Sequence, residues 1–155
     1  MLDRWLFNTN KLKTQCKLCI SRIKLMRNKK QLSVKQLLKE VGELLRQSKE
    51  DNAWIRVESA IHERQLLRAY DLLEVYLELL AVRVDLLAKI QAMPPDMMEA
   101  ICSVVYASQR LSGDLAELPA IRKLLVSKYD KSYKDFAVSA SSDLTYRDWH
   151  VNESL

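Results

Sequence analysis

The sequence contains very few residues that interrupt a helix. It has two Gly and three Pro among its 155 residues. These five residues make up about 3% of the chain, against roughly 12% in average proteins. Sandwiches and barrels of β-strands need a turn every 8–12 residues or so, and those turns draw on Gly, Pro, Asn and Asp. Hydrophobic residues, at 48%, supply enough apolar surface for a core. The composition therefore excludes an all-β protein and favours long helices.

A first long helix is expected from about Asn10 to Gln47. Apolar residues recur in this segment at steps of mostly three or four, which places them on one helix face. They are Leu12, Cys16, Cys19, Ile23, Met26, Val34, Leu37, Val41 and Leu44. A second apolar stripe repeats every seven residues and consists of Leu18, Leu25 and Leu32.

A second long helix is expected from about Asp51 to Ala92. Ser48, with Asp51 three residues later, resembles an N-terminal capping arrangement for it. Two apolar stripes run along this helix, so it must be covered on two sides. The Pro94-Pro95 pair ends it.

The remaining sequence predicts shorter helices. Asp96 with Glu99 indicates a capping box for a third helix, and Pro119 suits the first position of a fourth. In chain order we expect a third helix over 96–110, a helical turn over 114–118, a fourth helix over 119–136, a loop over 138–142 and a short last helix over 143–155. Two long helices joined by a few residues must be antiparallel neighbours. The prediction is one all-α domain, 1–155: a long antiparallel hairpin with three or more shorter helices packed on it.

Charge is distributed unevenly along the chain. Residues 1–50 hold 13 Lys or Arg and 4 Asp or Glu, a net charge of +9, whereas residues 51–155 hold 12 and 16, a net of −4; the sum is the overall +5. Between Arg4 and Lys39 there is no acidic residue. Such a segment favours an electrostatic partner: anionic lipid, nucleic acid or the acidic part of another copy.

The motifs that could carry chemistry are weak. Cys16 and Cys19 form a C-x-x-C inside a helical pattern, on the apolar stripe and with no second ligand pair, so we interpret them as core residues. His62 lacks the second His of a metalloprotease motif, and His150 stands alone. No phosphate-binding Gly-rich loop is present. We expect no enzyme activity, metal or cofactor.

The basic residues of the first helix are the candidate functional residues. A solvated helix face normally mixes charges of both signs, and this one does not. Trp5 and Phe7 are the only aromatic residues before Trp54, so nucleic-acid binding, which uses aromatic stacking, is not expected. An anionic membrane or a contact within a polymer fits better. This predicted basic face consists of Lys13, Lys17, Arg22, Lys24, Arg27, Lys29 and Lys30.

Several sequence blocks resemble one known family. They are Cys19-Ile20-Ser21-Arg22-Ile23-Lys24-Leu25, then Leu72-Leu73-Glu74-Val75-Tyr76-Leu77-Glu78-Leu79-Leu80, then Glu99-Ala100-Ile101-Cys102-Ser103-Val104-Val105-Tyr106-Ala107, and finally Lys128-Tyr129-Asp130-Lys131-Ser132-Tyr133. In this order they resemble a plant-like member of the increased-sodium-tolerance family, over about residues 2–138. That family regulates the AAA ATPase of the multivesicular-body pathway and belongs to the ESCRT-III group.

The resemblance implies a non-enzymatic adaptor or polymer subunit in endosomal sorting. It implies binding to an ESCRT-III partner of the charged-multivesicular-body-protein class, co-assembly on membranes and modulation of the ATPase. The expected location is cytoplasmic, peripheral at endosomes. The alternative is a soluble helical protein-interaction scaffold with no membrane contact.

The sequence also departs from the family pattern. The hairpin turn usually contains Gly and here has Ser48, and the family's C-terminal tail with MIT-binding motifs is not present, so ATPase binding is expected to be indirect. The family's final helix folds back on the hairpin. We expect a closed monomer in dilute solution that co-polymerises when activated, with a closing helix that uses Leu144, Val151 and Leu155.

Overall fold

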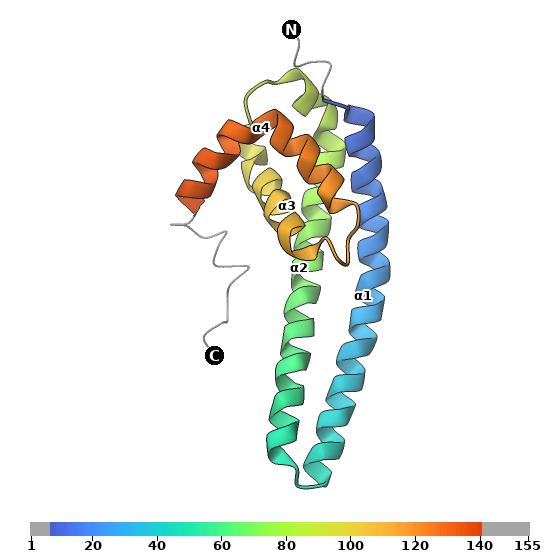
Figure 1. Cartoon of the computed structure of the whole chain (residues 1–155). Helices are drawn as coiled ribbons and strands as arrows, with labels where there is room; N and C mark the ends of the chain where they lie inside the picture. The colour runs from blue at the N-terminus through green and yellow to red at the C-terminus, as the bar shows by residue number, and fades with distance from the viewer. Residues whose placement is uncertain (1–6, 141–155) are drawn as a thin grey trace. The chain divides into compact units, whose positions relative to one another are not determined.

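The computed structural model describes residues 7–140, with side chains described as far as Tyr129. Within this range the chain is helical and contains no strand. The elements are α1 (Thr9–Arg46), α2 (Glu50–Lys89), the 3-10 turn η2 (Pro95–Met97), α3 (Met98–Leu111) and α4 (Leu118–Ala140) (Figure 1). The predicted all-α class and the long hairpin with shorter helices are therefore confirmed.

The turn between α1 and α2 ends α1 through Ser48. This residue has a φ of +58°, the left-handed conformation that usually falls to Gly after a helix. Its N–H donates to the carbonyl of Leu45 at 3.0 Å, and the N–H of Lys49 donates to the carbonyl of Leu44 at 2.9 Å. These two bonds form a Schellman motif. The prediction that Ser48 caps the N-terminus of the second helix is wrong, because α2 begins at Glu50 and its first backbone bond, from the Ala53 N–H, goes to the carbonyl of Lys49 at 3.1 Å, which makes Lys49 the N-cap.

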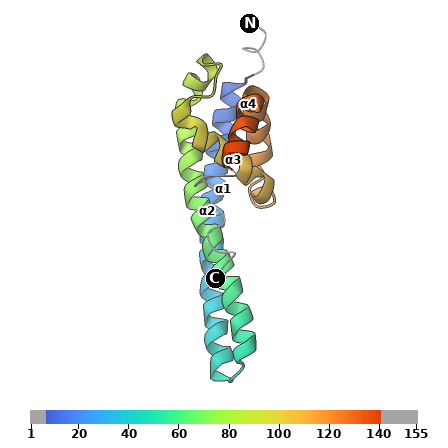
Figure 2. The same cartoon turned by 90° about the vertical axis from the view of Figure 1, so that its left-hand side faces the viewer.

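The described chain divides into two compact units. Unit 1 comprises residues 7–21 and 73–140, so it contains the start of α1, the second half of α2, and α3 and α4. In Figures 1 and 2, α3 and α4 lie against this part of the hairpin. The helices of this unit bury apolar side chains that are less than 2% exposed, among them Leu12, Cys16, Leu73, Leu77, Leu80, Leu87, Ile101, Val104, Leu118, Ile121 and Leu125. The two sides of α2 that were predicted to be covered are both buried in unit 1.

Unit 2 comprises residues 22–72, the end of α1 and the start of α2. Here the two helices run side by side and antiparallel (Figures 1 and 2). The seam is narrow and uses small residues on α2, with Ala53 and Ala60 both 3% exposed. Ile23 on α1 and Tyr70 on α2 are fully buried. A two-helix seam leaves much of each helix surface open to solvent.

The ends of the shorter helices differ from the predictions. Asp96 and Glu99 form no capping box: Asp96 pairs with Arg83, and Glu99 accepts a hydrogen bond from the Tyr76 hydroxyl. Both acids therefore tie the start of α3 to α2. The expected helical turn over 114–118 is a series of turns, and α4 continues through 138–140, where a loop was predicted.

Candidate interaction surface

Two residues of the predicted basic face belong to the seam of unit 2. Arg27 Nη2 lies 2.9 Å from Asp71 Oδ1. Lys30 Nζ lies 3.2 Å from Glu63 Oε2 and donates a hydrogen bond to Oε1 at 3.3 Å. The Lys30 and Glu63 side chains are only 20% and 18% exposed. Removing one member would leave the other charge partly desolvated, so this pair stabilises the contact between α1 and α2.

The sequence contained a signal for this position. Lys30 lies seven residues after Ile23 and four before Val34, which places it on the apolar stripe of α1. The stripe has no apolar member between Met26 and Val34, and Lys30 occupies that gap. Lys30 therefore lies on the side of α1 that packs in the seam and not on an outward-facing basic surface.

The other five predicted residues point outward. In unit 1, Lys13 and Lys17 are exposed, and in unit 2 the exposed residues are Arg22, Lys24 and Lys29.

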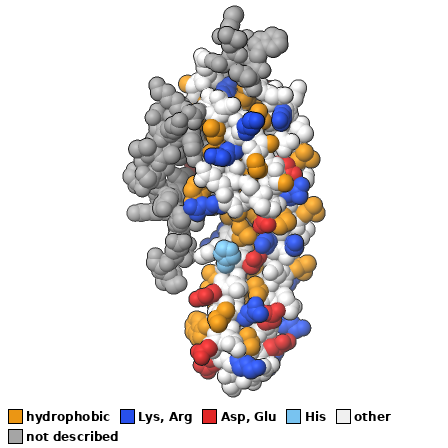
Figure 3. Space-filling model, in the orientation of Figure 1, with side chains coloured by type: hydrophobic (Ala, Val, Ile, Leu, Met, Phe, Trp, Pro, Cys, Tyr) orange, Lys and Arg blue, Asp and Glu red, His pale blue; other side chains and the backbone are white. Residues whose placement is uncertain are grey.

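Large leucines accompany these exposed cations. In unit 2, Leu25 is 70% exposed and Leu32 is 66% exposed. Lys24, Lys29 and Lys35 lie beside them on α1 and are exposed too. We call these five residues the lysine–leucine strip. Along the right-hand edge of Figure 3, where α1 runs, hydrophobic and basic side chains alternate. Exposed apolar side chains framed by one sign of charge are typical of a binding surface.

A second apolar strip lies on α2 within unit 1. It consists of Val75, Leu79, Val82 and Leu86, and Ile90 continues it just past the end of α2; Val75 is 59% and Val82 is 80% exposed. The steps from Val75 to Leu86 are four, three and four, the spacing of a coiled-coil seam. We call this set the α2 strip.

Acidic side chains line one edge of the α2 strip. Glu78 and Asp85 are exposed, seven residues apart, and neither forms an ion pair within the described part of the chain. This surface was not predicted from the sequence, because the apolar pattern of α2 was attributed to its two buried stripes. The alternation of three and four could have revealed it.

The cysteines are packing residues. Cys16 and Cys19 are fully buried in unit 1, and Cys102 is 4% exposed. Burial raises the pKa of the Cys16 thiol and of the Cys102 thiol to about 12. Both thiols are therefore protonated at neutral pH, and a protonated thiol is neither a good nucleophile nor a metal ligand. No group of three or more His, Cys, Asp or Glu that could hold a metal ion occurs among the described residues.

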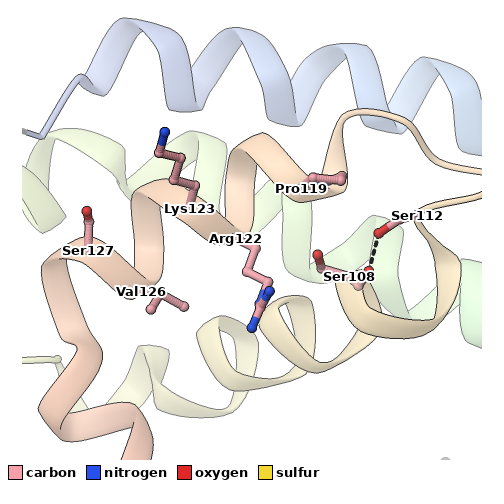
Figure 4. Close-up of a pocket in the computed structure, with 7 residues that line it drawn as sticks. All are labelled: Ser108, Ser112, Pro119, Arg122, Lys123, Val126 and Ser127. Atoms are coloured by element: carbon pink, nitrogen blue, oxygen red, sulfur yellow. Dashed lines mark hydrogen bonds between the residues drawn. The ribbon is translucent and has the colours of Figure 1, made fainter.

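A pocket of about 520 Å³ lies between the end of α3 and α4 (Figure 4). The Ser112 hydroxyl donates its hydrogen bond to the carbonyl of Ser108. Arg122 and Lys123 leave α4 in opposite directions in Figure 4. Their charges do not converge on one point, so the pocket does not assemble a catalytic or anion-binding cluster.

None of the described helices is both long enough and apolar enough to cross a membrane. The residues of the predicted closing helix, Leu144, Val151 and Leu155, lie outside the described residues, as does His150.

Comparison with known proteins identifies the family. The model of the Ist1 family, described as the regulator of Vps4 activity in the MVB pathway, matches residues 13–155. The chain belongs to the Ist1 family. The resemblance of the sequence blocks to this family is confirmed, and the plant-like character stays a prediction.

Two curated members of the Ist1 family are clearly similar. An IST1-like protein of Dictyostelium discoideum is 39% identical over 131 residues, which cover 84% of this chain and 35% of that protein. The vacuolar protein sorting-associated protein IST1 of Saccharomyces cerevisiae is 31% identical over 144 residues, covering 88% of this chain and 48% of that protein. The chain thus spans between about a third and a half of the length of these relatives.

A solved Ist1 structure has the same fold. The N-terminal domain of Saccharomyces cerevisiae Ist1, crystallised in complex with the Did2 MIM motif, superposes with a TM-score of 0.78. It is 28% identical, and the match covers 93% of this chain and 82% of that one. The described helices therefore correspond to an Ist1 N-terminal domain.

Proposed function

We propose that this chain is a non-enzymatic adaptor or polymer subunit of endosomal multivesicular-body sorting. It binds an ESCRT-III partner and modulates Vps4, the AAA ATPase that disassembles the polymer. The observation that carries this proposal is the family match over residues 13–155, together with a solved relative bound to a MIM motif. The location that goes with this role is cytoplasmic and peripheral at endosomes.

The basic face supplies the electrostatic part of the interaction. Its outward residues are spread along α1, so they act as a summed field rather than as one pocket. Each charge contributes about 1 kcal/mol near an anionic surface. The partner is a MIM-bearing ESCRT-III subunit of the charged-multivesicular-body-protein class, with an anionic membrane as a second ligand of the same residues. We assign no nucleic-acid partner.

The test compares two triple variants. One reverses Lys13, Lys17 and Lys29 to Glu, all exposed in the predicted basic face. The matched control makes the same change in net charge on α2 by reversing Arg64, Arg68 and Lys89, which are exposed as well. Circular dichroism establishes that both are folded.

Binding is measured by pull-down against a panel of ESCRT-III subunits and by pelleting with anionic liposomes across a salt series. We expect the first variant to lose binding at least tenfold and the control to keep it. Binding should also fall as salt shortens the Debye length from about 10 Å at 0.1 M to about 3 Å at 1 M. A folded first variant that binds like wild type at all salt concentrations would refute the role of the basic face.

The alternative, a scaffold without membrane contact, gives a different result in the same experiment. The wild type would then bind an ESCRT-III subunit but stay in the supernatant when the liposomes are pelleted, with and without that subunit. The role in the ATPase cycle is tested separately, by the rate of ATP hydrolysis of Vps4 with and without the chain and its partner. If a saturating concentration of the chain left the rate of ATP hydrolysis unaltered, that part of the proposal would be contradicted.

We also propose that the chain is a closed monomer in dilute solution. The support is the sequence pattern of Leu144, Val151 and Leu155, which would place three apolar side chains on one helix face. Light scattering at micromolar concentration should give the mass of one chain. An extended assembly under those conditions would contradict closure.

A further inference from the structure

The Lys128 side chain of α4 lies against two aromatic rings within unit 1. Its Nζ is 4.4 Å from the centroid of the Phe7 ring and 5.6 Å from the centroid of the Tyr129 ring. Both distances are within the roughly 6 Å over which the face of a ring attracts a cation. No carboxylate among the described side chains forms an ion pair with Lys128. Within this part of the chain, the charge of Lys128 is therefore stabilised by aromatic rings.

The backbone or a hydrogen bond holds each ring in place. Phe7 directly precedes Asn8, whose side-chain oxygen accepts a hydrogen bond from the Lys11 N–H at 2.9 Å and so caps the N-terminus of α1. The Tyr129 hydroxyl donates to the carbonyl of Leu87 at the end of α2. The contact of Phe7 with Lys128 therefore ties the capped start of α1 to α4.

The surroundings of Lys128 also change its chemistry. Its side chain is half-buried. Burial lowers the pKa of Lys128 below its ordinary value, because the charged form loses hydration. A larger fraction of the amine is then neutral at neutral pH, and the neutral amine is the nucleophile. Because the side chain is only partly covered, a small reagent can reach the nitrogen.

We propose that Lys128 is an acylation site whose modification releases Phe7 from α4. The co-reactant is an acyl thioester. The neutral amine attacks the carbonyl carbon of the thioester, a C–N bond forms, the C–S bond breaks, and the sulfur leaves as a thiol with the proton that the nitrogen gives up. The product is an uncharged amide, which the ring faces no longer attract as a cation. The start of α1 then loses its contact with α4.

The first experiment measures reactivity. The 155-residue chain is incubated with acetyl-CoA at pH 8, and mass spectrometry follows the acetylation of each lysine. Lys123 is the matched control, because it is exposed on the same helix five residues earlier. We expect Lys128 of the folded chain to react at least about threefold faster than Lys123, and the two to react at equal rates once urea has unfolded the chain.

Two outcomes would overturn the assignment of the reactive lysine. Lys128 could react no faster than Lys123 in the folded chain. Alternatively, the ratio of the two rates could be the same in urea, which would show that the neighbouring sequence and not the fold determines the reactivity.

The second experiment measures the effect on α1. Hydrogen exchange is followed at the amides of Lys11 and Leu12, which donate to Asn8 at the start of that helix. Lys128→Gln carries a neutral amide, as the acetylated side chain does. Lys128→Arg keeps the charge and cannot be acylated in this way, and Lys123→Gln is the control. Circular dichroism confirms that each variant is folded.

We expect Lys128→Gln to speed exchange at these two amides about threefold or more, because the attraction of a cation to a ring is lost. Lys128→Arg and Lys123→Gln should exchange like the wild type. An unchanged rate in Lys128→Gln would overturn the proposal. Equal acceleration in Lys128→Arg would overturn it too, since the packing of the lysine and not its charge would then hold Phe7.

A change on the other side of the contact completes the test. Phe7→Leu removes the ring and keeps an apolar side chain. It should speed exchange as Lys128→Gln does, and adding Lys128→Gln to it should have no further effect, because both changes remove one interaction. Additive effects would contradict the contact. The proposal requires neither lipid nor an ESCRT-III partner, so its failure would leave the proposed function intact.

Discussion

Replacing Ser48 with Gly tests how the two long helices are joined. Ser48 has a φ of +58°, a conformation that costs a residue with a Cβ about 1–2 kcal/mol and costs Gly nothing. Gly also gives the unfolded chain more freedom, which offsets about 0.4–1 kcal/mol of the gain. We therefore expect Ser48→Gly to raise the free energy of unfolding by about 0.5–1 kcal/mol.

The alternative role of Ser48 predicts the opposite sign. If its hydroxyl capped the N-terminus of α2, Gly would destabilise the protein by a few tenths of a kcal/mol and Ala by about 0.5–2 kcal/mol. At the end of α1, Gly stabilises and Ser48→Ala changes little, because Ala and Ser both carry a Cβ in the left-handed conformation. Ser48→Val should be worse than either, since a β-branched residue fits this conformation poorly.

Urea unfolding followed by circular dichroism measures these differences. The midpoint should rise for Ser48→Gly with an unchanged dependence on urea concentration, which shows that the native and unfolded states themselves are unaltered. The melting temperature should rise by about 1–4 °C for a chain of this size. A lower midpoint for Ser48→Gly, with a larger loss for Ser48→Ala, would refute the left-handed helix end.

Three further outcomes follow from the packing. Lys30→Glu should lower the free energy of unfolding by about 1–3 kcal/mol, because it places a second carboxylate beside Glu63 in the half-buried seam. Lys29→Glu should change the free energy of unfolding by no more than about 0.5 kcal/mol. Equal urea midpoints for the two variants would contradict this. Folded protein at pH 8 should resist iodoacetamide at Cys16 and Cys102 and react only after unfolding, as mass spectrometry of the alkylated chain can show. Stability should fall as pH rises above about 9: the unfolded chain then releases thiol protons that the folded chain holds until the pKa of about 12. A pH-independent urea midpoint between 8 and 10.5 would contradict that burial.

The long helices could be predicted because their periodicity is sustained. The expected segments, 10–47 and 51–92, match α1 and α2 to within a few residues. The capping of the helix ends could not be predicted as well. Asp96 and Glu99 have the spacing of a capping box, but Arg83 and Tyr76 on α2 take up both carboxylates. Sequence spacing alone cannot show which tertiary partners compete for a side chain.

Only part of the basic face could be predicted, for a related reason. A net charge of +9 over residues 1–50 identifies α1 as the charged helix. The net charge does not show which cations form ion pairs inside the fold. Lys29 and Lys30 are neighbours in sequence, yet Lys29 is exposed and Lys30 is paired with Glu63, 33 positions further along the chain. Only the register of the hairpin brings that acid opposite Lys30.

The break in α4 at Tyr129 isolates the segment that follows it. Tyr129 has φ −121° and ψ 22°, its side chain is 2% exposed, and its hydroxyl donates a hydrogen bond to the carbonyl of Leu87 at 3.4 Å. The break interrupts the cooperative hydrogen-bond ladder, so residues 130–140 must nucleate their helix separately. They are fewer than the roughly 12–15 residues that an isolated helix needs in water. Amide exchange in this segment is thus a built-in reporter: slow exchange there signals that something is packed on it, whatever the state of the hairpin.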